Sequence, residues 1–261
     1  MNFGHSSEKN KNLSDEEKKS SELAPQFADQ QGDRWSFVAV LPDTSFIHTI
    51  HHSKRTAEQA AIFLRKIKAK SDGQAPLFLS DAWFYSEVLF ETYCHYKAVP
   101  YSGRGRPPHP IRIVDEQLKY AQVYKQRDSK GKLISITARI IKGTEAEILA
   151  IIQKAGRSKT INTSFVESRN GKYRKDDARL NRKTACHSKK VEYHDAHADF
   201  LTTIFNYCRQ NEALKELINP NAARFETKYL RKSPAMAEGL TDKILTVKEL
   251  LLYRVPMDSI L

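Results

Sequence analysis

Three acidic residues lie where a carboxylate could take part in chemistry: Asp43, Asp81 and Glu167. Asp81 directly follows the apolar run Leu77–Leu79. A carboxylate in that position is desolvated on one side and open on the other, which suits a ligand of a hard divalent cation. The alternative is that Asp81 caps a helix or forms a turn, roles for which Asp is favoured.

Glu167 is one of very few acids in a stretch otherwise rich in Arg and Lys. The apolar residues 165–166 precede it, so its surroundings are expected to be partly buried. A cation ligand is one interpretation of Glu167. The other is an exposed helix acid that pairs with Arg169 or Lys172, an interaction of about 0.3–0.5 kcal/mol.

The basic residues are concentrated in one part of the chain. Residues 97–190 hold 23 Lys/Arg and 8 Asp/Glu, a net charge of +15, whereas the whole chain carries +12, so the remainder sums to −3. Such a segment favours a polyanion such as nucleic acid, although a solvated surface is the simpler alternative. The candidate DNA contacts are Arg104, Arg106, Arg169, Asn170, Arg174, Arg179, Arg182 and Lys183, with Lys172 and Lys175 on the same predicted helix. Arg104 and Arg106 belong to Gly-Arg-Gly-Arg-Pro-Pro, which is similar to the core of an AT-hook.

Other metal and nucleotide chemistries find less support. The histidines gather in two groups, His48, His51 and His52, and His187, His194 and His197, but no H-E-x-x-H motif is present. The cysteines Cys94, Cys186 and Cys208 are too far apart for a C-x-x-C zinc motif or a disulfide ladder. We therefore expect no zinc site, and a reducing cytoplasm. The sequence also contains no G-x-x-x-x-G-K-[ST] phosphate loop.

The first half of the chain alternates strand and helix patterns. Residues 35–40 and 46–51 predict a hairpin around a turn at 41–44, and Thr56 is expected to cap the next helix. A short buried strand at 77–79 and a helix over 82–94 follow. This order predicts an α/β sheet with helices packed on it. Because the carboxyl ends of strands carry the chemistry in such sheets, Asp81 is well placed.

The second half begins with the irregular segment 101–110, which is full of Gly and Pro. The remaining predicted elements are an inserted basic hairpin at 119–126 and 133–141 around the turn 128–131, a basic helix capped by Asn162 or Thr163 and ending near 184, a helix over 189–211, and a capping box at Thr246–Glu249. We expect a polar arm or long loop over 1–33, a core over 34–212 with a basic insertion at about 97–160, and a C-terminal extension over 213–261. No apolar run is long enough for a membrane span or a signal peptide, so no membrane partner is expected.

Several of these motifs together resemble an insertion-sequence DDE transposase of the insertion-sequence-one type. The strongest match is Thr160-Ile-Asn-Thr-Ser-Phe-Val-Glu-Ser-Arg-Asn170, which continues into Ala178-Arg-Leu-Asn-Arg-Lys-Thr184 and Ser188-Lys189. The other matches are Arg55–Glu58 followed by Ser80-Asp81, and Pro234–Asp242 followed by Leu250 and Tyr253–Pro256. The resemblance covers about residues 32–256.

The resemblance implies a fold, a reaction and a cofactor. The fold would be a ribonuclease-H-like mixed sheet flanked by helices, with the basic hairpin inserted and a helical extension at the C-terminus. Asp81 and Glu167 would correspond to the second and third catalytic acids and would hold two Mg²⁺ or Mn²⁺ ions for cleavage and strand transfer of DNA. The implied partners are element-end DNA, target DNA, and a second copy or a full-length transposase, in a nucleoid-associated cytoplasmic protein.

The sequence also departs from the family pattern. Residues 1–4 match the later part of the family's opening strand, so the first catalytic Asp would fall about three residues before Met1, as in an N-terminally truncated copy. Three interpretations stay open: a transposase core, a catalytically dead fragment that binds DNA or a full-length transposase, and a decaying reading frame with no function. At positions 171 and 173, where the family usually has helix-forming or apolar residues, this chain has Gly171 and Tyr173. At positions 186 and 187, where the family favours small and aromatic residues, it has Cys186 and His187.

Overall fold

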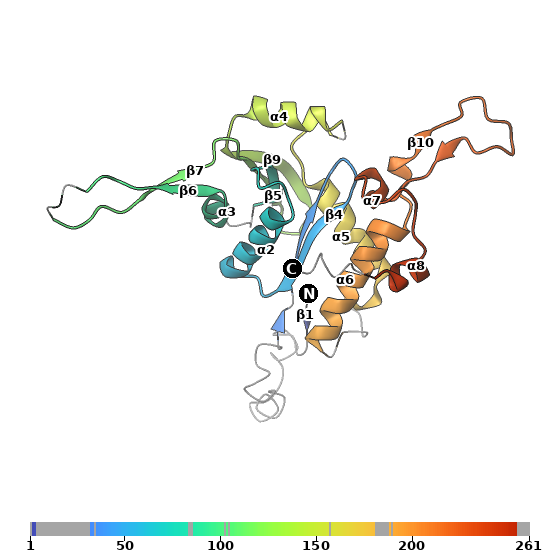
Figure 1. Cartoon of the computed structure of the whole chain (residues 1–261), viewed down its shortest axis with the longest axis horizontal. Coiled ribbons are helices and arrows are strands. Elements are labelled where there is room, and N and C mark those ends of the chain that lie inside the picture. Colours follow the sequence, from blue (N-terminus) through green and yellow to red (C-terminus); the bar gives the residue numbers. More distant parts are fainter. Residues whose placement is uncertain are drawn as a thin grey trace, which may run out of the picture. The chain divides into compact units, whose positions relative to one another are not determined.

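The chain folds as a mixed α/β structure with a mixed sheet and flanking helices (Figure 1). The computed structural model describes residues 2–3, 32–33, 35–82, 86–101, 103, 105–156, 158–180, 188 and 190–254. The chain divides into two compact units. The sheet unit comprises residues 35–39 and 51–173, and the helical unit comprises residues 1–34, 40–50 and 174–261.

The predicted N-terminal hairpin and its following helix are confirmed. Strand β3 (Trp35–Val40) pairs with β4 (Ile47–Ser53) in a two-stranded sheet. Helix α2 (Ala57–Ala69) begins after Thr56, whose hydroxyl accepts a hydrogen bond from the Gln59 amide. This contact satisfies one of the amides that a helix N-terminus otherwise leaves unpaired.

The principal sheet of the sheet unit has three strands in the order β5-β8-β9. Strand β5 (Leu77–Asp81) runs parallel to β8 (Lys119–Arg127), which is antiparallel to β9 (Leu133–Lys142). The sequence correctly predicts β8 and β9 as a hairpin. However, β8 is the middle strand of the sheet, so the hairpin is part of the sheet and not an appendage to it.

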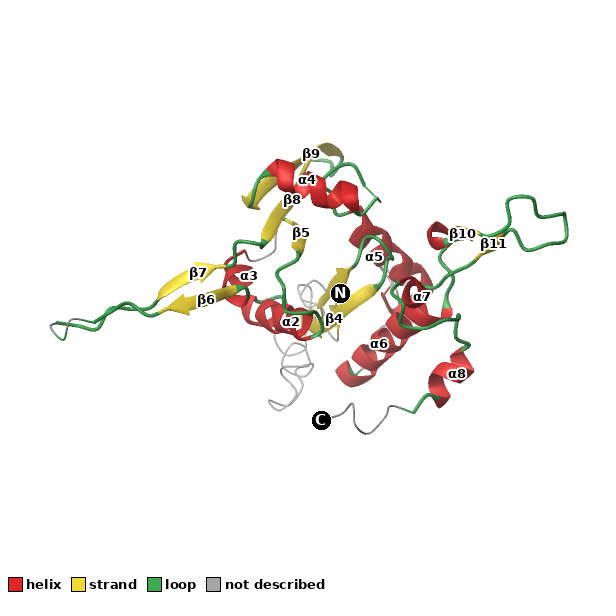
Figure 2. Cartoon of the chain, turned by 45° about the horizontal axis from the view of Figure 1, so that its top comes forward, coloured by secondary structure: helices red, strands yellow, loops and turns green. Residues whose placement is uncertain are grey.

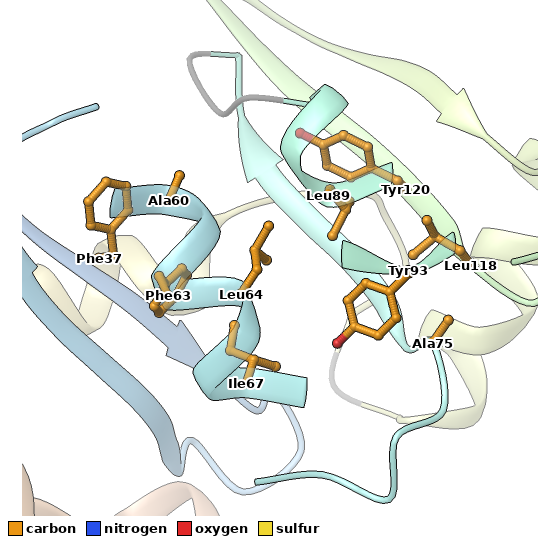
Figure 3. Close-up of a cluster of buried hydrophobic side chains, with 10 residues drawn as sticks. All are labelled: Phe37, Ala60, Phe63, Leu64, Ile67, Ala75, Leu89, Tyr93, Leu118 and Tyr120. Atoms are coloured by element: carbon orange, nitrogen blue, oxygen red, sulfur yellow. The ribbon is translucent and has the colours of Figure 1, made fainter. Parts of the chain in front are cut away.

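One face of this sheet packs against α2 and α3 (Ser86–Thr92). Helix α3 is shorter than the predicted helix over 82–94, and residues 83–85 lie outside the described part of the chain. Side chains from both helices and from β8 form the main hydrophobic core, in which Leu64, Leu89, Leu118 and Tyr120 have no exposed surface (Figure 3).

The opposite face packs against α4 (Glu145–Lys154), which the sequence analysis did not predict (Figure 2). Its core comprises Ala121, Val123, Ile148, Ile152 and Ile161. The sequence carries the T-x-x-E signature of a capping box at Thr144–Glu147. Both of its hydrogen bonds form: the Thr144 hydroxyl accepts from the Glu147 amide, and the Glu147 carboxylate accepts from the Thr144 amide. The helix was therefore detectable from its cap.

The segment predicted to be irregular is the end of a long two-stranded arm. Strand β6 (Cys94–Lys97) pairs with β7 (Ile111–Val114), and the arm extends away from α3 (Figure 1). Arg112 on β7 forms ion pairs with Glu87 and Glu91 on α3, at 3.0 and 3.2 Å. These contacts join the base of the arm to the sheet unit.

The basic helix α5 (Ser164–Asp176) starts where predicted and ends earlier. Asn162 caps it, because its side-chain oxygen accepts a hydrogen bond from the Ser164 amide. A 3-10 turn over Ala178–Leu180 follows, and residues 181–187 lie outside the described part of the chain.

The helical unit is organised around α6 (Val191–Cys208), which was predicted over 189–211 and packs against α7 (Pro234–Ala237) and α8 (Val247–Leu252). The buried side chain of Asn206 bonds the backbone amide and carbonyl of Ile47, each at 3.0 Å. The predicted capping box at Thr246–Glu249 is present. Two short pairs complete the unit: β1 (Asn2–Phe3) with β2 (Gly32–Asp33), and β10 (Glu216–Leu217) with β11 (Tyr229–Leu230).

The N-terminal segment 1–33, predicted to be a polar arm or long loop, is described at only four positions, those of β1 and β2. The rest of this segment lies outside the described residues. Within the described part of the chain, no helix combines the length and apolar character that a membrane crossing requires.

Candidate cation site and basic surface

Asp81 is the last residue of β5, and it is exposed. It lies opposite Val123 on the parallel strand β8. Since side chains alternate between the faces of a strand, Asp81 shares a face with Leu79, which packs against the core beneath α4. The residues of β5 that precede Asp81 are half-buried, and Asp81 itself is exposed to solvent.

The same face of β8 carries a regular pattern of charge and burial. Every second residue from 119 to 125 lies on this face. The two middle ones, Ala121 and Val123, are buried, and a lysine stands at each end, Lys119 and Lys125. Each flanking lysine pairs with a glutamate from a helix. Lys119 contacts Glu147 of α4 at 2.9 Å, and Lys125 contacts Glu167 of α5.

Glu167 therefore pairs with a neighbouring strand and not within its own helix. The sequence-based alternative, a pair with Arg169 or Lys172, is wrong as to the partner. The Glu167 side chain is 52% exposed, and it also accepts a hydrogen bond of 2.8 Å from the Thr163 hydroxyl. The structure thus gives Glu167 a fixed position while leaving half of its surface open.

Asp81 and Glu167 come to the same end of the sheet through β8. Lys125 lies two residues beyond Val123, the partner of Asp81, which is roughly 7 Å along the strand. Both acids offer exposed carboxylate oxygens, the ligands that Mg²⁺ and Mn²⁺ prefer. Glu167 already pairs with one positive group, the Lys125 ammonium group.

Asp81 and Glu167 are the residues that would hold a divalent ion here. In the described part of the chain, no group of three or more His, Cys, Asp or Glu residues could hold a metal. The two carboxylates would need water or phosphate oxygens to complete a coordination shell.

The other face of the sheet carries a hydrogen-bonded chain of polar side chains that was not predicted from the sequence. Ser80 and Tyr120 are joined at 2.8 Å, Gln122 donates to the Tyr120 hydroxyl at 2.7 Å, and Tyr124 donates to Gln122 at 3.2 Å. Burial raises the pKa of Tyr120. Because Ser80 directly precedes Asp81, this network attaches the end of β5 to β8 on the face opposite the Asp81 side chain. Its signal in the sequence was the polar alternation at positions 120, 122 and 124.

The structure divides the predicted DNA contacts. Arg169 is only 4% exposed, and its guanidinium lies 4.3 Å from the centre of the Tyr173 ring. It belongs to the packing of α5, contrary to its prediction as a surface contact. Asn170 and Arg174 are half-buried, whereas Lys172, Lys175 and Arg179 are exposed. Arg106 is exposed on the arm, and Arg104, Arg182 and Lys183 lie outside the described residues.

The remaining candidates are dispersed. Asp43 is exposed in the turn after β3. His51 contacts Gln59 and Lys66, and His52 contacts Ser36. The remaining described members of the two histidine groups have separate partners: His48 contacts Thr49, His194 contacts Ser188, and His197 lies 3.1 Å from Asp177. His187 and Cys186 are outside the described residues.

The chain matches no protein-family model, and comparisons with curated proteins and with solved structures give no match either.

Proposed function

We propose that this chain is the core of a DDE transposase of the insertion-sequence-one type, with a ribonuclease-H-like sheet. The observation that carries the proposal is that Asp81 ends β5 opposite Val123, and that Lys125, two residues further along β8, pairs with Glu167. The basic helix that carries Glu167 and the basic arm add the charge that a DNA substrate requires.

The proposed reaction has two phosphoryl-transfer steps. In the first, a water oxygen bonds to a phosphorus atom at the element end, and the broken P–O bond releases a 3′-hydroxyl. In the second, that 3′-hydroxyl bonds to a phosphorus atom of target DNA and releases a target 3′-hydroxyl. Divalent ions, when bound, activate the attacking oxygen and stabilise the leaving one.

The chain's own residues would orient the reactants. Asp81 and Glu167 bind the cations, and the polar network behind Ser80 keeps Asp81 in place. The exposed side chain of Lys172, on the part of α5 that carries Glu167, would contact a backbone phosphate, which positions DNA without reading its sequence. Lys175 and Arg179 are exposed in the helical unit and would contact phosphates independently of this site. Arg106 on the arm would contact DNA away from the reacting phosphate.

A nicking assay on supercoiled plasmid with Mn²⁺ or Mg²⁺ tests the proposal. We expect any nicking to require the divalent ion, and we expect Asp81→Asn or Glu167→Gln to lower its rate by more than about 100-fold. That figure is the upper end of the loss seen when a residue that only supports a metal ligand is replaced. Glu147→Gln is the matched control, since Glu147 also pairs with a lysine of β8. Nicking that survives both substitutions would overturn the site assignment.

A second candidate is a DNA-binding protein that does not cleave. It is favoured by the observation that the described residues contain no group of three or more His, Cys, Asp or Glu side chains that could hold a metal ion. This candidate predicts DNA affinity that falls steeply with salt, with a slope of about −0.9 per neutralised phosphate, and no nicking by any version of the chain. DNA binding that does not respond to salt would contradict both candidates.

A further inference from the structure

A lysine stands where the proposed site needs positive charge. Lys125 forms an ion pair with Glu167, and its side chain is only 27% exposed. The same face of β8 is buried at Val123, and the Lys125 side chain reaches Glu167 of α5. The ammonium group is thereby held at the end of the sheet where Asp81 also lies.

We propose that Lys125 is the resident counter-ion of Glu167, and that a divalent cation must displace its ammonium group before Asp81 and Glu167 can bind the cation together. This inference rests on the proposed function. Without a cation, the ammonium group offsets the charge of the Glu167 carboxylate. When a cation binds, the ammonium group competes for the same oxygen atoms and repels the incoming charge. Lys125 is therefore a positioning residue that lowers cation affinity and holds Glu167 ready.

The pair at the other end of the strand shows what a purely structural contact looks like. Glu147 receives Lys119, and it also accepts hydrogen bonds from the amide and hydroxyl of Thr144 at 2.8 and 2.9 Å. Its carboxylate is committed to the start of α4. Glu167 receives only side-chain donors in the described structure, Lys125 and Thr163, and holds no backbone amide. Its carboxylate can exchange partners without uncapping a helix.

The simpler alternative is that Lys125 only attaches α5 to the sheet. That role predicts that removing the lysine lowers thermal stability and leaves cation affinity unchanged or weaker. The counter-ion role predicts the opposite change in affinity. Because exposed ion pairs contribute little to stability, Lys125→Gln is expected to fold.

The experiment is a titration of the whole chain with Mn²⁺, in which free Mn²⁺ is followed by electron paramagnetic resonance at low salt. We expect Lys125→Gln to bind Mn²⁺ about two- to fivefold more tightly than the unmodified chain, the range that corresponds to the strength of exposed ion pairs. Lys119→Gln is the matched control and is expected to leave the affinity unchanged. The difference made by Lys125→Gln is expected to shrink as salt screens the charge.

Variants of the acids separate the two proposals. If Glu167→Gln weakens Mn²⁺ binding while Lys125→Gln binds no more tightly than the unmodified chain, the counter-ion role is overturned and the proposed function stands. If Asp81→Asn and Glu167→Gln leave binding unchanged, or if no version binds Mn²⁺, both proposals are overturned.

Discussion

The two ends of the α4-facing side of β8 carry the same pair of residue types and use them differently. At the start of the strand, Lys119 pairs with Glu147, which also caps α4. Near its end, two residues beyond the partner of Asp81, Lys125 pairs with Glu167, which has half of its side chain exposed. Residue type therefore does not distinguish a structural pair from a candidate site. The structural pair and the candidate site are distinguished by the other partners of the glutamate and by how exposed its side chain is.

The largest expected effect concerns the core beneath the structural pair. Ile148 is fully buried beside Glu147, and Ile148→Ala should lower the free energy of unfolding by about 2–5 kcal/mol through lost burial and a cavity. Ile151 on the same helix is 42% exposed, so Ile151→Ala is the control and should cost less than about 1 kcal/mol. Urea unfolding measures both. Equal effects would show that α4 does not pack as described.

The next effect separates backbone strain from contact with Lys119. Gly143 has φ +89°, and an added Cβ would lie 2.6 Å from Cδ of Lys119. Gly131 has φ +81° with no atom within 4 Å of such a Cβ. Gly131→Ala should cost about 1–2 kcal/mol from strain alone, and Gly143→Ala should cost more. A smaller loss at Gly143 in urea unfolding would argue against the close approach of Lys119.

A smaller effect of opposite sign is expected in the helix that carries Glu167. Gly171 lies inside α5, and an added Cβ would meet nothing within 4 Å. Gly171→Ala should therefore stabilise the chain by about 0.5–1 kcal/mol, because glycine is a poor helix former. Its nicking activity should be unchanged. A loss of stability would place a neighbour against this face of α5.

The smallest effect is a pH dependence at the structural end. The Lys119 ammonium group and then the Thr144 amide lower the pKa of Glu147 from 4.5 to about 2. Its contribution to stability is therefore complete above about pH 4.5 and is lost as the pH falls toward 2. Urea unfolding at several acidic pH values should show a shallower loss for Glu147→Gln than for the unmodified chain. Identical profiles would contradict the lowered pKa.

Local signals in the sequence predicted much of the fold. The Pro-Asp turn identified the first hairpin, Thr56 identified the start of α2, and the apolar run before Asp81 identified β5. Helix α4 was not predicted, although the capping-box signature that begins at Thr144 can be recognised in the sequence. The arm was missed because Gly and Pro dominate the loop between β6 and β7, and only four residues on each side form strand.

The candidate site was predictable only in part. Exposure of Asp81 follows from its place at the end of a packed strand. The partner of Glu167 does not follow from sequence, because Lys125 is 42 positions away and meets Glu167 only through the packing of α5 near β8. Burial of Arg169 against Tyr173 was hidden for a related reason: a basic helix looks uniformly exposed until tertiary packing selects one of its faces.

The most direct test of the central claim is to map where a cation binds. With Fe²⁺ in place of Mg²⁺, ascorbate and peroxide generate hydroxyl radicals that cut the backbone beside the bound ion. We predict cuts near residues 79–82, 123–125 and 163–168, their loss in Asp81→Asn and Glu167→Gln, and no cuts near Glu147. Cuts elsewhere, or cuts that persist in both variants, would contradict a cation site formed by Asp81 and Glu167.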